Sequence, residues 1–194
     1  MVSPEGGLQG RTGLFAFCLC AAGFLAPVIV AVATGDATRL VDIRALLLLS
    51  ILVVLSWIDL RTLTLPDWLT LPLTALGLCD AAFFVDRSVW DALLGALLSG
   101  GLLWAISEYY WRVRGVDALG LGDAKLAAAA GAWLGWLDVA VFLTVASVIG
   151  LLGILVLAVA RRRLDANSPF PFGPALALSL WGVWVLGPFF TLAP

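Results

Sequence analysis

The sequence contains no histidine, only three cysteines and few charged residues, and each shortage excludes a class of protein. Without histidine there can be no His-based catalytic triad, and most zinc sites are excluded. Cys18, Cys20 and Cys79 lie inside apolar runs and form no C-x-x-C pair, so neither a zinc ribbon nor a disulfide framework is expected. The net charge of −2 indicates no basic surface for nucleic acid.

The composition is that of a protein surrounded by lipid. Charged residues make up 12% of the chain and hydrophobic residues 62%, with a mean hydropathy of +1.08. Soluble domains usually carry about twice this charged fraction. We therefore predict an all-α fold, a polytopic helical bundle in a lipid bilayer with about six or seven transmembrane helices. No cofactor and no metal are predicted, and the sequence does not indicate an oligomeric state.

Apolar segments separated by polar turns give seven candidate spans, of which the fifth is short for a span of about 20 residues. They cover residues 14–33, 45–58, 68–85, 92–111, 123–136, 139–160 and 175–190. Residues 1–13 are predicted to form a cytoplasmic tail and residues 14–194 a single transmembrane domain. Pro66 is placed to begin the third helix and Asp91 to cap the fourth.

The first apolar segment has a second interpretation. Arg11 precedes it, and Ala31-Val32-Ala33 has the form of a signal-peptide cleavage site. We favour a retained span, because the apolar stretch is long for a signal peptide. The later topology is the same under either interpretation.

Lysine and arginine predict the orientation of the chain. With a cytoplasmic N-terminus, the inside segments hold Arg11, Arg61, Arg112, Arg114, Lys125, Arg161, Arg162 and Arg163. The outside segments hold only Arg39, Arg44 and Arg87. This bias places Asp59, Asp67, Asp123 and residues 171–174 on the cytoplasmic side.

Two aspartates, Asp59 and Asp123, stand at the edges of apolar runs. Placing an unpaired carboxylate in hydrocarbon costs at least ~2.5 kcal/mol. Two such carboxylates on one membrane face therefore suggest that they serve a common function. Two adjacent carboxyl groups cannot both ionise easily, and the pair then holds one proton over a working pH range. Such a pair suits peptide hydrolysis: the ionised member activates water and the protonated member donates to the carbonyl oxygen.

The residues around Asp123 fit this chemistry. Gly120 and Gly122 would allow close approach of the backbone and positive φ. The positive end of the helix dipole would favour the charged form of Asp123. Lys125 lies near enough in sequence to tune Asp123 or to hold an acidic group of a substrate.

Simpler interpretations remain open at this point. Asp123 and Asp67 each open an apolar run and could be plain helix caps. Asp59 could be a solvated loop acid beside Arg61. The G-x-G-D pattern of residues 120–123 is weak when taken alone.

Together, these motifs resemble the type IV prepilin peptidase family, membrane aspartic peptidases with a G-x-G-D signature. The first resembling stretch is Ile-Asp-Leu at 58–60, followed by Leu-Pro-Asp-Trp-Leu-Thr-Leu-Pro at 65–72. The second is residues 118–126, which contain the G-x-G-D and precede an Ala-rich helix at 127–136. The third is Pro-Phe-Gly-Pro at 171–174. The resemblance covers about residue 46 to the C-terminus.

The resemblance implies that Asp59 and Asp123 are the catalytic pair, with Gly120, Gly122, Lys125 and Asp67 as supporting residues. The implied reaction removes the leader peptide of type IV prepilins or pilin-like precursors, which are single-helix membrane proteins of type IV pili and protein secretion. It would take place at the cytoplasmic face of the inner membrane.

The sequence departs from the family in one respect. Larger members carry a cytoplasmic insert with two C-x-x-C pairs and also N-methylate the mature pilin, whereas here residues 34–44 fill the comparable gap. We therefore expect peptidase activity without methyl transfer and no site for S-adenosylmethionine.

Two alternatives belong to other classes. A small proton-coupled carrier could use paired aspartates to bind protons or cations. The position of both acids at one face, and the lack of a clear internal repeat, disfavour it. A structural subunit of a secretion apparatus would use the aspartates only as caps.

Overall fold

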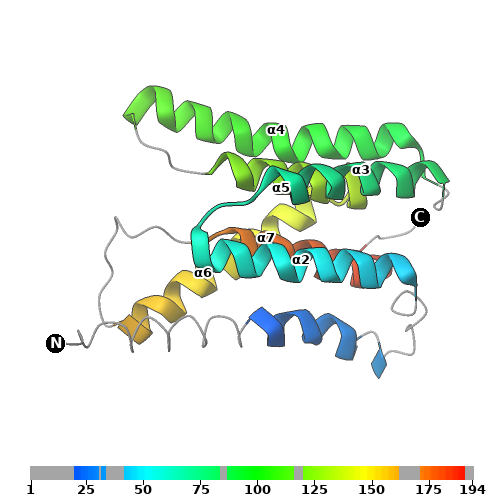
Figure 1. Ribbon diagram of the computed structural model, residues 1–194, viewed down its shortest axis with the longest axis horizontal. Coiled ribbons are helices and arrows are strands. Elements are labelled where there is room, and N and C mark those ends of the chain that lie inside the picture. Colours follow the sequence, from blue (N-terminus) through cyan, green and yellow to red (C-terminus); the bar gives the residue numbers. More distant parts are fainter. Residues whose placement is uncertain are drawn as a thin grey trace.

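The computed structural model describes residues 20–30, 32–33, 42–83, 87–115, 120–161 and 171–190. All regular structure within these ranges is helical (Figure 1), which confirms the predicted all-α bundle. The helices are α2 (Ile43–Thr62), α3 (Asp67–Phe83), α4 (Val89–Arg114), α5 (Leu121–Leu134), α6 (Val139–Arg161) and α7 (Gly173–Phe190). A short apolar helix, Cys20–Val30, precedes them.

Some predictions concern residues outside the described ranges. They include the tail at 1–13, the start of the first span with Cys18, Ala31 of the signal-peptide interpretation, and Arg39, Arg162 and Arg163.

Three helices in the described part of the chain are long and apolar enough to cross a bilayer. They cover Ile43–Thr62, Val89–Val113 and Val139–Val156. Cys20–Val30 and Gly173–Gly187 are apolar but shorter. Helix α5 has 14 residues, so it rises about 21 Å, less than the ~30 Å of a hydrocarbon core. The membrane class is confirmed, and α5 is as short as the sequence predicts.

The predicted end of the second helix is wrong by one turn. Helix α2 continues past residue 58 to Thr62, and Leu63 closes it with a left-handed conformation (φ 54°). The N–H of Leu63 donates to the carbonyl of Asp59 at 2.9 Å. Asp59 therefore lies in the last turn of α2.

The predicted starts of two helices also need correction. Pro66 stands just before α3 and not within it, and its carbonyl accepts the N–H groups of Leu69 and Thr70. Ser88, not Asp91, caps α4: the Ser88 hydroxyl accepts the N–H of Trp90 at 3.2 Å. Asp91 lies in the first turn, where a carboxylate still interacts favourably with the helix dipole.

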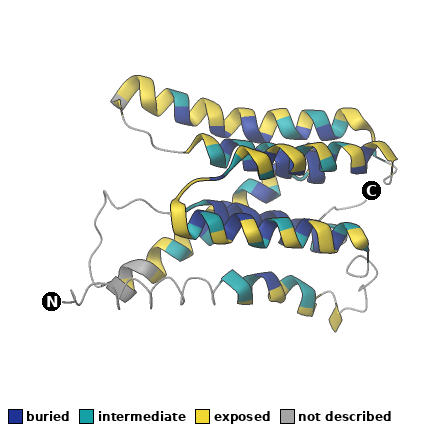
Figure 2. Cartoon of the chain, in the orientation of Figure 1, coloured by how far each residue is buried: buried dark blue, intermediate teal, exposed yellow. Residues whose placement is uncertain are grey.

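The short helix α5 is packed between α3, α4 and α7, and most of its residues are buried (Figure 2). Small residues make this possible. A Cβ on Gly131 would collide with the carbonyl of Gly95 in α4, so the two backbones lie against each other. At the same crossing, the buried Ser99 hydroxyl donates to the carbonyl of Ala127 at 2.7 Å. Close backbone approach of this kind is typical of helix packing in membranes.

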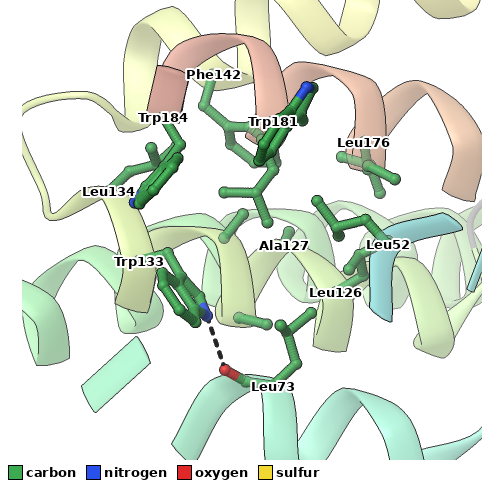
Figure 3. Packing of buried hydrophobic residues seen from close by; sticks show 14 of the residues in the cluster. Leu52, Leu73, Leu126, Ala127, Trp133, Leu134, Phe142, Leu176, Trp181 and Trp184 are labelled. Atoms are coloured by element: carbon green, nitrogen blue, oxygen red, sulfur yellow. Dashed lines mark hydrogen bonds between the residues drawn. The ribbon is translucent and has the colours of Figure 1, made fainter. Parts of the chain in front are cut away.

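Tryptophans join α5 to the rest of the bundle (Figure 3). The indole N–H of Trp133 donates to the carbonyl of Leu73 in α3 at 2.9 Å. The Trp133 ring packs edge-on against Trp184 of α7, which stacks on Trp181. The Trp181 N–H in turn donates to the carbonyl of Phe24 in the first helix at 3.0 Å. These contacts hold α5 and α7 in fixed relative positions.

Arginines contact the C-terminal end of α5 and the N-terminal end of α2, which lie at the same end of the bundle (Figure 1). The Arg87 guanidinium donates to the carbonyls of Trp133 and Ala132 at 2.9 and 3.0 Å, so it satisfies the C-terminal end of α5. Arg44 forms ion pairs with Asp42, which caps α2, and with Asp80 of α3 at 3.1 Å.

The α4–α5 crossing yields a first prediction. Gly131→Ala should lower the melting temperature in detergent markedly, because the added methyl would overlap the Gly95 carbonyl; overpacking typically costs about 1–3 kcal/mol. Gly101→Ala is the matched control, because a Cβ there meets nothing within 4 Å. This control should be as stable as wild type or more so, since alanine favours a helix. Equal melting temperatures for the two variants would contradict the close crossing.

Candidate functional site

Four helix termini meet at one end of the bundle. Helix α2 runs opposite to α3, α5 and α7, so its C-terminal end lies beside their N-terminal ends (Figure 1). This arrangement gathers Asp59, Asp67, Asp123 and Gly173 at one end. Arg44 and Arg87 lie at the other end. The fold thus places these two groups of residues at opposite ends of the bundle (Figure 1).

Asp59 is buried in the last turn of α2, with 4% of its surface exposed. Its Oδ2 accepts a hydrogen bond from the backbone N–H of Gly173, the first residue of α7, at 3.0 Å. The Arg61 guanidinium lies over the Trp57 ring, 4.2 Å from its centroid. The interpretation of Asp59 as a solvated loop acid is therefore wrong.

Asp123 is partly buried in the first turn of α5. The N-cap of α5 is Gly120, whose carbonyl accepts the Asp123 N–H at 3.0 Å. Asp123 is thus not the cap residue. Asp123 therefore lies at the end of the bundle where α2 ends and α5 begins, the end that also holds Asp59 (Figure 1). Two carboxyl groups brought together in this way repel each other when both are ionised.

The glycines near Asp123 act through their lack of a side chain. A Cβ on Gly122 would come within 2.9 Å of the Leu65 Cβ, so Gly122 lets α5 approach the α2–α3 loop closely. Neither Gly120 nor Gly122 has positive φ; among the described glycines only Gly115 and Gly135 do. The expected positive φ is wrong for both: Gly120 is the N-cap of α5 with φ −64°, and Gly122 lies in the first turn of the helix.

Lys125 and Asp67 form a second contact between these helices. The Lys125 ammonium donates to Asp67 Oδ1 at 2.6 Å, and the side chains are 43% and 59% exposed. Asp67 lies in the first turn of α3 and Lys125 in the second turn of α5. The pair therefore links α3 to α5 beside the two aspartates.

Gly173 is a site residue that the sequence did not single out. The Pro-Phe-Gly-Pro motif at 171–174 drew attention to the segment, but nothing in it indicates a contact with Asp59. That contact joins residues 114 positions apart in the chain. Only the packing of α7 against α2 creates it.

Within the residues that the structure describes, no group of three or more histidine, cysteine or acidic residues could hold a metal ion.

Comparison with known proteins gives the family. Residues 46–155 match the type IV leader peptidase family. The chain belongs to this family. The matched region begins where the resemblance begins and contains both Asp59 and Asp123. It ends before Gly173.

Curated relatives carry the name prepilin leader peptidase/N-methyltransferase. The relative from Aeromonas hydrophila is 39% identical over 78% of this chain and 52% of its own length. The relative from Pectobacterium carotovorum is 43% identical over 69% of this chain and 48% of its own. For Escherichia coli K12 the identity is 40% over 77% of this chain and 65% of the relative. The chain thus spans about half the length of most of these relatives. No solved structure matches it.

The exposure of Lys125 and Asp67 yields a second prediction. Because the Lys125 and Asp67 side chains are 43% and 59% exposed, water screens the pair and their coupling energy should be small, about 0.2–1 kcal/mol. A double-mutant cycle with Lys125→Ala, Asp67→Ala and the double variant, followed by unfolding in detergent, measures it. A coupling energy several times larger would show that the pair is held far more rigidly than its exposure indicates.

Proposed function

We propose that this chain is a membrane aspartic endopeptidase that removes the leader peptide of prepilins or pilin-like precursors at the cytoplasmic face of the membrane. One observation carries the proposal: the two aspartates lie on different helices at the same end of an apolar bundle (Figure 1), Asp59 in the last turn of α2 and Asp123 in the first turn of α5. Membership of the type IV leader peptidase family supports it, as do the names of the curated relatives.

The proposed mechanism needs only the two carboxyl groups. The ionised member accepts a proton from a water molecule, which attacks the scissile carbonyl carbon. The protonated member donates to the carbonyl oxygen, and a proton then passes to the leaving amine. The bundle supplies rigid positions for both groups, because Asp59 lies inside α2 and Asp123 inside α5.

The proposed substrate is a protein with one apolar helix, which would lie against the outer surface of the bundle. We propose the inner membrane as the location, with the N-terminus cytoplasmic, because lysine and arginine gather on that side. We also propose cleavage without N-methylation, because residues 34–44 stand where larger family members carry an insert with two C-x-x-C pairs, and they contain no such pair.

The comparisons lend no support to a proton-coupled carrier or a purely structural subunit. All three hypotheses differ in what Asp59 and Asp123 do. A peptidase loses cleavage when either is replaced, a carrier loses pH-dependent flux, and a structural subunit changes little.

The third prediction tests cleavage. The wild-type chain, Asp59→Asn and Asp123→Asn are each co-expressed with a pilin-type precursor from the same genome. Leader removal is followed by gel mobility and N-terminal sequencing. Each variant should lower cleavage at least about 100-fold, because positioned acid–base groups typically contribute 10²–10⁴-fold.

Asp91→Asn is the matched control for this assay. It makes the same chemical change in the first turn of α4, away from the two carboxyl groups, and should leave cleavage intact. All variants must be present in the membrane at equal abundance. Continued cleavage by Asp59→Asn or Asp123→Asn would refute the dyad, and intact precursors with wild type would make proton flux the next measurement.

A fourth prediction concerns orientation. Thr64 is exposed at the end that carries Asp59, and Ser88 is exposed at the other end. In a chain whose three cysteines are replaced by serine, a membrane-impermeant maleimide should label Thr64→Cys only from the cytoplasmic side. Ser88→Cys should be labelled only from the opposite side. The reverse pattern would contradict the proposed orientation.

A further inference from the structure

The first residue of α7 makes a direct contact with one of the two aspartates. The N–H of Gly173 donates to Asp59 Oδ2 at 3.0 Å, and both residues are buried. The donor is one of the N–H groups at the start of a helix that have no partner within the helix. Asp59 thus binds at the positive end of the α7 dipole, where negative charge is stabilised.

The contact explains why residue 173 is glycine. A Cβ at this position would lie 2.7 Å from Asp59 Oδ2, 2.9 Å from its Cγ and 3.3 Å from its Cβ. Gly173 is not among the described residues with positive φ. Close approach to the carboxyl group, rather than backbone conformation, therefore requires the glycine.

The two carboxyl groups have unequal surroundings. Asp59 accepts a hydrogen bond from a backbone N–H, an interaction that favours the ionised form of a carboxyl group. Asp123 also lies near the start of a helix, but no described residue donates a hydrogen bond to its carboxyl group. Pairs of acids with different environments commonly divide the roles of acid and base.

Other charged groups near Asp59 do not create this asymmetry. Helix α7 has no titratable side chain across 173–190. From α5, Asp123 faces Asp59, while Lys125 pairs with Asp67 of α3. On α2 itself, Arg61 lies over Trp57. Among the described groups, the Gly173 amide is therefore the one whose hydrogen bond favours ionisation of Asp59 over that of Asp123.

We propose that Gly173 is a positioning residue whose N–H holds Asp59 as the ionised member of the pair, so that Asp59 acts as the base and Asp123 as the acid. This inference rests on the proposed peptidase function. It assigns a role to the Pro-Phe-Gly-Pro motif, which lies outside the region matched to the family.

The test is the pH dependence of cleavage by Gly173→Ala. The methyl group would push the Asp59 carboxyl group away from the N–H. Without that bond the ionised base is less favoured, so the acidic limb of the pH–rate profile should move to higher pH. We expect kcat to fall about 10-fold or more near the wild-type optimum, with a much smaller change in KM, because the base acts in the chemical step.

Gly182→Ala is the matched control in the same helix. A Cβ there would meet only the Pro27 side chain, at 3.9 Å, so this variant should keep the wild-type profile. If Gly173→Ala does not accumulate in the membrane, an amide-to-ester replacement serves instead. Cell-free translation into lipid nanodiscs with glycolic acid at position 173 removes the N–H without adding a methyl group, and the same shift of the acidic limb is expected.

The outcomes separate this inference from the proposed function. A fall in kcat without a shift of the acidic limb, or a profile equal to that of Gly182→Ala, would overturn the role of Gly173. The proposed function would stand in that case as long as Asp59→Asn and Asp123→Asn are inactive. Cleavage by those two variants would instead overturn the proposed function itself.

Discussion

A carboxyl group buried inside an apolar bundle needs a hydrogen-bond donor, and the packing of α7 against α2 supplies one to Asp59. The bond from Gly173 connects residues far apart in the chain. It requires that α7 begin at the level of the last turn of α2, with no side chain between them. The lengths and directions of the helices are therefore coupled to the position of one carboxyl oxygen.

The short helix α5 brings the second carboxyl group to the same place. Its N-terminal end approaches the α2–α3 loop because Gly122 has no side chain, and its middle lies against α4 because Gly131 and Gly95 have none. Its C-terminal end is held by Arg87 and by the Trp133 contact with α3. A helix held at both ends and along one side has little freedom to move, which favours a fixed position for Asp123.

The family and the geometry support the same proposal by independent routes. Sequence comparison places the chain in the type IV leader peptidase family without reference to any contact. The structure brings two acids together without reference to any relative. Because the chain spans about half the length of most of the relatives described above, the activity of the whole relatives is carried to it only as a proposal.

The sequence by itself determined the membrane class, the helical fold and most of the helices, and it drew attention to Asp59 and Asp123, because these features depend on local composition and on the cost of charge beside apolar runs. It misplaced the end of α2, since the apolar run stops at Ile58 while the backbone hydrogen bonds continue to Thr62. It could not decide whether Asp123 and Asp67 were caps, because a cap and a functional acid look alike at a helix start. Only the tertiary structure showed that Asp59 is buried, that Lys125 reaches Asp67, and that the Gly173 N–H binds Asp59. Each of these contacts joins different helices, and helical periodicity carries no information about which helix ends meet.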